Sequence, residues 1–468
     1  YQLIMDYRYH NQVKVEHDID ESILDKKIPK NILQPLVENA YYHGLSADTG
    51  EIQGNIEILI YPLEDELIIE ISDDGKGFSE KRLMEIRENL KHATMHKEKE
   101  AHIGMENIYN FSIGNPSVPV PQAFTNRMIE LLQTEDPVKL HSYSPSLGLP
   151  STRQAVADSL NKRFGMNYTM DHIFMTSAAA SALAHALRCV TKDGDEVITF
   201  APYFPEYVPY VTGTGAKLTV IPADITTFQI NFEEFEKSLN PNVQAILINS
   251  PNNPSGIVYS TATITKLADI LRAKEKEYGH PIYLISDEPY REIVFAGVDA
   301  PFISKLYENT ICCYSFSKSV SLPGERIGYM AVNPACEDAK LLVLMAGQIS
   351  RFTGHNCPPS IIQMAVESVL DQTSDLSIYE TNKNILYKEL TRIGYEMVEP
   401  GGTFYMFPRA LIEDANEFCW RAAKELNLII VPGDSFLCPG HFRISYCVTT
   451  DMVEKAIPLF EKLYKLYR

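Results

Sequence analysis

The chain has 468 residues, 42 basic and 61 acidic, and a formal net charge of −19 at pH 7. Hydrophobic residues make up 45% of it and charged residues only 22%, which excludes disorder as the dominant state. No apolar run approaches the roughly 18 residues of a membrane span, and the acidic balance argues against a nucleic-acid partner. At about 150 residues per domain, the length predicts about three domains.

Charge and cysteine are distributed unevenly along the chain. Residues 1–110 carry a net charge of −10, whereas the other 358 residues carry −9. All eight cysteines lie in the second part, from Cys189 to Cys447, without CxxC spacing. Scattered cysteines of this kind are typical of reduced thiols in the cytoplasm. We therefore expect a cytoplasmic protein built from two segments that meet at Asn110 and Phe111.

The first segment alternates helix and strand signals. Residues 29–44 have the apolar period of a helix, with Pro29 in its first turn and Gly44 at its end. Residues 55–61 and 66–72 predict two strands joined by a short polar turn. Residues 81–100 are charged and predict a further helix. This segment is therefore expected to be an α/β domain.

Three motifs mark the first segment as a candidate nucleotide site. The predicted helix contains Asn39 in LVENAYYHG, and Asp73 ends the second strand in DDGKG. An Asn on an amphipathic helix can hold Mg²⁺, and an Asp after a strand can accept a hydrogen bond from an adenine amino group. The glycines would let a loop fold over the nucleotide; these are Gly75, Gly77 and, in HIGMEN, Gly104.

Together these motifs resemble the ATP-binding domain of sensor histidine kinases. The resemblance implies that Asn39 is the Mg²⁺ ligand and that Asp73 accepts a hydrogen bond from the adenine amino group. It also implies that the glycines form the loop and the lid over the nucleotide. The family's later strands are missing after Asn110, so we expect a partial α/β sandwich with an uncovered edge strand. The phospho-acceptor helix would lie upstream of Tyr1, which is read as a cut or processed end. Kinase activity is therefore not expected, and His10 and His17 are expected to be exposed.

The second segment alternates strands and helices. Residues 196–200, 243–249 and 282–286 predict buried strands of an α/β enzyme. The run 315–326 then places Lys318 eight residues before Arg326. A lysine in such a turn can form a Schiff base when its neutral form is favoured, and an arginine fork suits a phosphate. A solvated loop is the alternative for this run alone.

Three further polar positions favour a catalytic site. The strand at 282–286 runs into Asp287, at the carboxyl end of the strand where α/β sites form. An aspartate there can keep a pyridine nitrogen protonated. Asn253 lies in a turn after another strand, and Arg443 follows late in the chain in FRIS. Each could alone be a turn, a cap or a surface cation, but their combination indicates one site.

The motifs SFSK…PGER, DEPY, NNPSG and FRIS make residues 111–468 resemble the class I/II aminotransferases, pyridoxal-phosphate enzymes of fold type I. The resemblance implies a large mixed-sheet domain at 141–335 and a small α/β domain at 111–140 and 336–468. It implies that Lys318 is the Schiff-base lysine that moves the proton, and that Asp287 faces the pyridine nitrogen. Contacts to the ring and phosphate are implied for Tyr290, Asn253, Ser315, Ser317, Arg326 and Phe204, the last of which could instead be a core aromatic.

The resemblance also implies a substrate site and a homodimer. Arg443 matches the arginine that binds the substrate α-carboxylate, and Gly114 lies near that carboxylate. Tyr143 matches a tyrosine that reaches the cofactor phosphate of the neighbouring subunit. Arg351 lies where dicarboxylate-specific members offer an arginine across the interface, although a one-residue gap leaves a surface or interface arginine as the alternative. An acidic substrate is therefore favoured.

The sequence departs from the family in two places. The phosphate loop usually reads Gly-Ala-x-Gly-Ala-Leu, but residues 178–183 are Ala-Ala-Ala-Ser-Ala-Leu. The N–H groups of Ala179 and Ala180 could still meet a phosphate at a helix N-terminus, but a Cβ in place of glycine is costly where φ is positive. The helix expected before Gly114 is missing, so the chain is interpreted as a chimaera.

The sequence therefore predicts an aminotransferase that moves an amino group from an amino acid to a 2-oxo acid by a ping-pong reaction on pyridoxal phosphate. The fusion could impair it. The first alternative is an ATP-binding signalling fragment, with Mg²⁺ and ATP as ligands, joined to an inactive aminotransferase. The second is a misfolded, inactive fusion.

Overall fold

The computed structural model describes residues 13–20, 22, 40, 54–63, 66–75 and 107–468. The chain divides into two compact units, Tyr1–His102 and Ile103–Arg468. Of the sequence predictions, the helices at 29–44 and 81–100 fall outside the described residues, apart from Ala40.

The described part of the first unit is a three-stranded sheet in the order β1 (Val13–Ile19), β2 (Gly54–Leu63) and β3 (Glu66–Asp73). Strands β2 and β3 confirm the two predicted strands and pair antiparallel. Strand β1 was not predicted; it pairs parallel with β2 and carries the exposed His17. Val13 and Ile56 are buried together with Ala40 and form a small apolar cluster.

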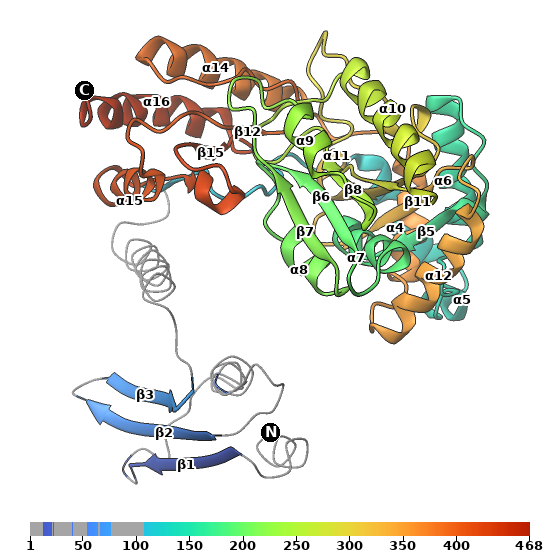
Figure 1. Cartoon of the computed structure of the whole chain (residues 1–468), viewed down its shortest axis with the longest axis horizontal. Helices are drawn as coiled ribbons and strands as arrows, with labels where there is room; N and C mark the ends of the chain where they lie inside the picture. The colour runs from blue at the N-terminus through green and yellow to red at the C-terminus, as the bar shows by residue number, and fades with distance from the viewer. Residues whose placement is uncertain (1–12, 21, 23–39, 41–53, 64–65, 76–106) are drawn as a thin grey trace. The chain divides into compact units, whose positions relative to one another are not determined.

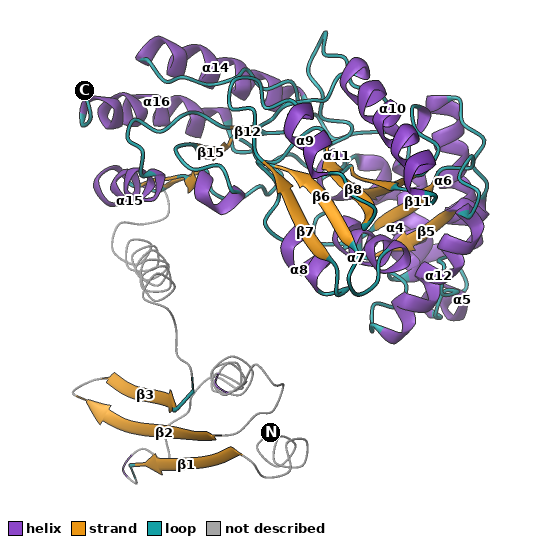
Figure 2. Ribbon diagram, viewed as in Figure 1, coloured by secondary structure: helices purple, strands orange, loops and turns teal. Residues whose placement is uncertain are grey.

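The second unit is built on a seven-stranded mixed sheet (Figures 1 and 2). The three predicted strands are present as β6 (Glu196–Phe200), β8 (Val243–Asn249) and β9 (Tyr283–Asp287). Only β11 is antiparallel to its neighbours. The order is β5 (Ile173–Thr176), β11 (Gly328–Val332), β10 (Thr310–Ser315), β9, β8, β6 and β7 (Lys217–Ile221).

Helices cover both faces of this sheet, because successive side chains of each buried strand point to opposite faces. Helices α7 (Ala178–Val190), α8 (Tyr207–Thr212) and α12 (Ala339–Phe352) share one apolar cluster with the sheet. The opposite face packs against α4 (Gln122–Thr134), α6 (Pro150–Phe164), α9 (Phe232–Ser238), α10 (Thr261–Tyr278) and α13 (Ser360–Val366). Helices α4, α12 and α13 lie within the predicted small domain but pack against the large sheet.

A second core lies at the other end of this unit (Figure 1). Its three long helices, α14 (Ser377–Ile393), α15 (Ala415–Leu426) and α16 (Thr450–Lys465), pack around short strands. These strands are β12 (Tyr405–Met406), β13 (Leu428–Ile429), β14 (Val431–Pro432) and β15 (Phe442–Ser445).

Short helical elements connect the longer ones throughout this unit. They are α5 (Pro137–His141), α11 (Phe316–Ser319), η4 (Met170–His172), η5 (Ile303–Lys305), η6 (Glu367–Val369) and η7 (Gly433–Phe436).

The segment from 109 to 114 is part of this second core. Strand β4 (Tyr109–Asn110) pairs parallel with β13, although the sequence analysis places these residues in the first segment. The Phe111 N–H then donates to the Ile429 carbonyl at 2.8 Å, and the Phe111 carbonyl accepts from the Ser445 N–H at 2.8 Å. The carbonyls that follow Phe111 are therefore held beside β15, at the site described next.

Candidate active site

Three parallel strands bring the predicted polar residues together. Strands β8, β9 and β10 are neighbours in the sheet, and Asp287 is paired with Asn249 on one side and Cys313 on the other. Lys318 lies on the short helix α11 immediately after β10, and Asn253 lies in the turn after β8. Since the carboxyl ends of parallel strands meet at one edge of a sheet, these side chains share that edge.

The carboxylate of Asp287 is buried and has one hydrogen-bonded oxygen. Its Oδ2 accepts from the Tyr207 hydroxyl at 2.6 Å. Its Oδ1 is fully buried and has no partner among the described residues. Burial raises the pKa of Asp287 to about 7, against the effect of the tyrosine hydrogen bond. Asp287 is thus a carboxylate with one oxygen available to a cationic or donating group.

The Lys318 amine is enclosed at the edge of the sheet. Its Nζ donates to the Gly114 carbonyl at 2.6 Å and lies 5.7 Å from the centre of the Phe404 ring. Burial lowers the pKa of this amine; Cys447 opposes this effect, and Arg326 and Arg443 add to it. A lowered pKa favours the neutral amine, which is the nucleophilic form.

Arg443, on β15, points toward the same region. Its Nη1 donates to Asn253 Oδ1 at 2.9 Å and its Nη2 to the Ser112 carbonyl at 2.6 Å. Its Nε is buried and without a partner among the described residues. The guanidinium lies 4.6 Å from the centre of the Tyr405 ring. Arg443 is therefore fixed in place and still has donor capacity.

Serine hydroxyls and a helix N-terminus lie near Lys318. The Ser315 and Ser317 hydroxyls are 2.6 Å apart, and Ser315 also caps α11. Gly328 pairs with both Ser315 and Thr176, which places α7 next to this turn. Ala178, the first residue of α7, has a φ of +67°. The backbone strain expected for a residue other than glycine in this loop therefore occurs at Ala178.

Gly328 allows the close approach of this loop. A Cβ at Gly328 would overlap the Tyr314 carbonyl and would lie 2.9 Å from the Ala178 Cα. Ala179 is buried and Ala180 half-buried in the first turn of α7.

Arg326, the arginine expected at the phosphate, also has a positive φ, of +49°. Its side chain is exposed and donates to the Pro323 carbonyl at 3.1 Å.

Two tyrosines that the sequence analysis did not identify complete the site. Tyr207 contacts Asp287 as described, and Tyr405 lies 3.1 Å from Tyr290, hydroxyl to hydroxyl. A Cβ at Gly114 would overlap the Tyr405 hydroxyl, so glycine is required there for space. The only sequence signal for either residue was an aromatic cluster, PYFPEY for Tyr207 and TFYMF for Tyr405.

Comparisons with known proteins agree with this arrangement. Residues 106–459 match the family model for aminotransferase class I and II. The chain belongs to the class I and II aminotransferases. An aromatic-amino-acid aminotransferase of Thermococcus litoralis is 31% identical, with 77% of this chain and 93% of the relative covered. An aspartate aminotransferase of Thermotoga maritima is 29% identical over 76% of this chain and 91% of its own length.

Solved structures extend the comparison. An aminotransferase from Eubacterium rectale has a TM-score of 0.77 and 45% identity, covering 84% of this chain and 97% of its own. The aspartate aminotransferase of Thermotoga maritima has a TM-score of 0.71 at 26% identity, covering 82% of this chain and 97% of its own. This aminotransferase is thus an enzyme that transfers amino groups, and the cofactor expected for its family is pyridoxal phosphate.

Three other predicted site residues of this aminotransferase are partly or largely exposed. Phe204 is half-buried, with its ring 5.9 Å from that of Tyr207 and nearly perpendicular to it. Tyr143 is 97% exposed. Arg351 is exposed near the end of α12. The described contacts bring neither Tyr143 nor Arg351 to Lys318.

The predicted nucleotide site is described only in part. Asp73 is exposed at the end of β3, and its Oδ1 accepts from the Gly75 N–H at 3.1 Å. Asn39, Gly77 and Gly104 lie outside the described residues. The family match spans residues 106–459 and does not test the histidine-kinase resemblance, which stays a prediction.

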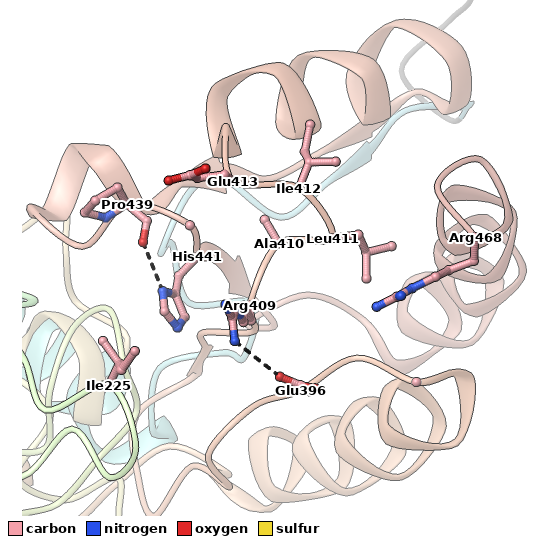
Figure 3. Close-up of a pocket in the computed structure, with 12 residues that line it drawn as sticks. Ile225, Glu396, Arg409, Ala410, Leu411, Ile412, Glu413, Pro439, His441 and Arg468 are labelled. Atoms are coloured by element: carbon pink, nitrogen blue, oxygen red, sulfur yellow. Dashed lines mark hydrogen bonds and ion pairs between the residues drawn. The ribbon is translucent and has the colours of Figure 1, made fainter.

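A separate pocket of about 720 Å³ lies in the part of the aminotransferase that carries α14–α16 (Figure 3). Arg409 pairs there with Glu396 at 3.7 Å, and a ring nitrogen of His441 lies 3.2 Å from the Pro439 carbonyl. None of the predicted site residues lines it. Among the described residues, no group of acidic, His and Cys side chains could hold a metal, and no helix is long and apolar enough to cross a membrane.

Proposed function

We propose that the cluster around Lys318, Asp287 and Arg443 holds pyridoxal phosphate and an acidic amino acid, whose amino group passes to a 2-oxo acid. The observation that carries the proposal is the buried Oδ1 of Asp287, which has no partner among the described residues. A buried acceptor without a partner is costly, and a protonated pyridine nitrogen would satisfy it. The residues present therefore fit the cofactor.

When bound, pyridoxal phosphate supplies an aldehyde that takes up the substrate amine and a ring that withdraws electrons from it. Asp287 Oδ1 would accept a hydrogen bond from the protonated ring nitrogen and keep that nitrogen charged. Lys318 Nζ would hold the aldehyde carbon in the resting enzyme, would be released as a free amine when the substrate amine takes its place, and could then accept the proton from the substrate Cα. Its burial favours the neutral amine that this step needs.

The other residues of the cluster hold the cofactor and orient the substrate. Tyr290 and Asn253 would donate to the phenolic oxygen of the ring, and Phe204 would cover one ring face. The phosphate would be bound where the N-terminus of α7 favours negative charge, by Ser315, Ser317, Arg326 and the N–H groups of Ala179 and Ala180. Arg443 binds the substrate α-carboxylate with its fork, beside Gly114.

The acidic substrate and the homodimer are proposed together. Tyr143 and Arg351 are exposed, as residues that reach a second copy would be. Phe352, next to Arg351, is also exposed at 76%. A second copy would place its Tyr143 at the phosphate and its Arg351 at the substrate side-chain carboxylate. The aspartate aminotransferases among the relatives are consistent with this substrate class.

Lys318→Ala tests the chemistry. We expect the purified protein to be yellow with cofactor and the variant to lose at least about 10³-fold in kcat while still binding cofactor noncovalently. Borohydride reduction followed by peptide mapping would identify the modified lysine. Turnover undiminished in Lys318→Ala would overturn the assignment, and a cofactor-independent melting temperature with aggregation would indicate an inactive fusion.

A donor screen tests the substrate class. Aspartate, alanine and tyrosine are compared as donors, in wild type and in Arg351→Ala, with size-exclusion chromatography to measure the oligomer. We expect aspartate to be preferred and Arg351→Ala to lower its kcat/KM by about 10- to 100-fold, with little effect on alanine. Equal losses for all three donors would contradict a role at the substrate side chain.

A second candidate function rests on Asp73. Its exposed carboxylate follows a strand and precedes the glycines of DDGKG, and this supports binding of ATP with Mg²⁺ by the first unit in a chimaeric chain. Titration of a fluorescent ATP analogue, with Asn39→Ala and Asp73→Asn as variants, tests it. Binding that neither variant weakens would contradict it. An intact reading frame in genomic DNA, with a full-length product, would exclude an assembly artefact.

A further inference from the structure

The helix that follows the Phe204 segment begins with a fully buried tyrosine. Tyr207 has no exposed surface, and its hydroxyl donates to Asp287 Oδ2 at 2.6 Å. The other carboxylate oxygen has no partner among the described residues. The two oxygens of one carboxylate therefore have different surroundings, and Tyr207 creates the difference.

Tyr207 is itself held firmly. Its ring is stacked on Tyr203, with centroids 6.0 Å apart and planes 14° apart, and meets Phe204 edge-on at 5.9 Å. Its N–H donates to the Phe204 carbonyl at 3.0 Å. A tyrosine fixed in this way loses little further freedom when it donates a hydrogen bond, so it can hold Asp287 in one orientation.

The backbone of Asp287 is held by a further hydrogen bond. Asn249 Nδ2 donates to the Asp287 carbonyl at 2.9 Å. With the main chain held by Asn249 and Oδ2 held by Tyr207, the position of Oδ1 is determined. A carboxylate without the tyrosine could rotate about its side-chain bonds and exchange its oxygens.

We propose that Tyr207 is a positioning residue that fixes Asp287 through Oδ2 so that Oδ1 faces the ring nitrogen of pyridoxal phosphate. The inference rests on the proposed function, because it requires the cofactor ring to bind at Asp287. Tyr207 also connects Asp287 to Phe204, the residue proposed to cover the ring. One short segment thus sets both the ring stacking and the ring-nitrogen contact.

The test compares Tyr207→Phe with Tyr203→Phe. Both variants remove one hydroxyl from a buried tyrosine of the same stacked pair, but only Tyr207 contacts Asp287. The dissociation constant of pyridoxal phosphate is measured by equilibrium dialysis, and kcat and KM are measured with an amino donor. We expect Tyr207→Phe to weaken cofactor binding about 10-fold and to lower kcat about 10-fold with KM nearly unchanged. Tyr203→Phe is expected to stay within about two-fold of wild type.

A double-mutant cycle shows whether Tyr207 acts through Asp287. In an Asp287→Asn background, the effect of Tyr207→Phe on the cofactor dissociation constant should fall to about two-fold or less. An undiminished effect in that background, or wild-type cofactor affinity in Tyr207→Phe, would overturn the inference. Failure of wild type to form a borohydride-trapped adduct at Lys318 would overturn the proposed function, and this inference with it. An intact adduct with unchanged affinity in Tyr207→Phe would overturn the inference alone.

Discussion

Both units end a strand with an aspartate that the sequence marks as functional, and the structure gives the two residues opposite surroundings. Asp73 ends β3 and is exposed. Asp287 ends β9 and is 5% exposed, with a pKa raised by burial to about 7. The same residue type at the same kind of position therefore has different chemistry, because the local packing decides how much water reaches it.

The strands that carry these residues explain the difference. In β3 of the first unit none of the residues 68–73 is buried, whereas in β9 of the second unit all five residues are buried. A strand buried on both faces carries its last side chain into a dry site, where a carboxylate interacts strongly with a partner charge. An exposed carboxylate is screened by water and ions.

Exchanging each aspartate for asparagine should give the largest contrast. We expect Asp287→Asn to lower kcat for amino transfer by about 10³-fold, because the amide cannot hold the ring nitrogen in its charged form. Asp73→Asn should leave kcat within about two-fold. Steady-state kinetics with saturating cofactor measures both. A large loss in Asp73→Asn would show that the first unit contributes to catalysis and would break the comparison.

The second largest contrast between Asp287 and Asp73 should appear in the pH dependence of stability. In the folded protein, burial raises the pKa of Asp287 from the ordinary value of 3.8 to about 7. Between these values the folded protein keeps a proton that the unfolded chain has lost, so the free energy of unfolding falls as pH rises from about 4 to 7. Each pH unit between these values lowers the free energy of unfolding by about 1.4 kcal/mol.

Asp287→Asn removes this titration and provides the reference. Urea unfolding of the cofactor-free protein is measured at several pH values, and the difference between wild type and variant isolates Asp287 from the other acids. We expect wild type to lose stability relative to the variant as pH rises toward 7. Parallel curves would show that Asp287 is hydrated in the cofactor-free protein.

The sequence predicted well which polar residues meet at one edge of the large sheet. Lys318, Asp287 and Asn253 each follow a buried apolar strand in a local motif, and parallel strands align their carboxyl ends by geometry. Strands β6 and β8 were predicted to the residue for the same reason. Strand β1 was missed, because only one of its residues is fully buried and its charges conceal the alternation.

Contacts between distant segments could not be predicted. Tyr207 meets Asp287 across 80 residues, and Tyr405 meets Tyr290 across 115. The carbonyls of Ser112 and Gly114 reach Arg443 and Lys318 only because the segment from 109 runs beside β13 and β15. A pattern within one segment carries no information about which distant segment packs against it.

The loops beside the two predicted ligand sites give the smallest test of the comparison. The first unit has Gly75 and Gly77 after its strand, whereas the second has Ala178, with a φ of +67°, at the start of α7. An alanine in the left-handed region costs about 1–2 kcal/mol, and a glycine loses about 0.5–1 kcal/mol to its freedom in the unfolded chain. Ala178→Gly should therefore raise the free energy of unfolding by up to about 1 kcal/mol.

Ala179→Gly is the matched control, because Ala179 lies one residue further into the same helix. Glycine there relieves no left-handed strain and should cost about 0.5–1 kcal/mol. Urea unfolding of both cofactor-free variants measures their free energies of unfolding. Relative to wild type, the two changes should have opposite signs. If both variants were destabilised equally, the left-handed backbone at Ala178 would be carrying no strain. The alanine in place of glycine would then be neutral for the fold, and its effect would have to be sought in phosphate affinity.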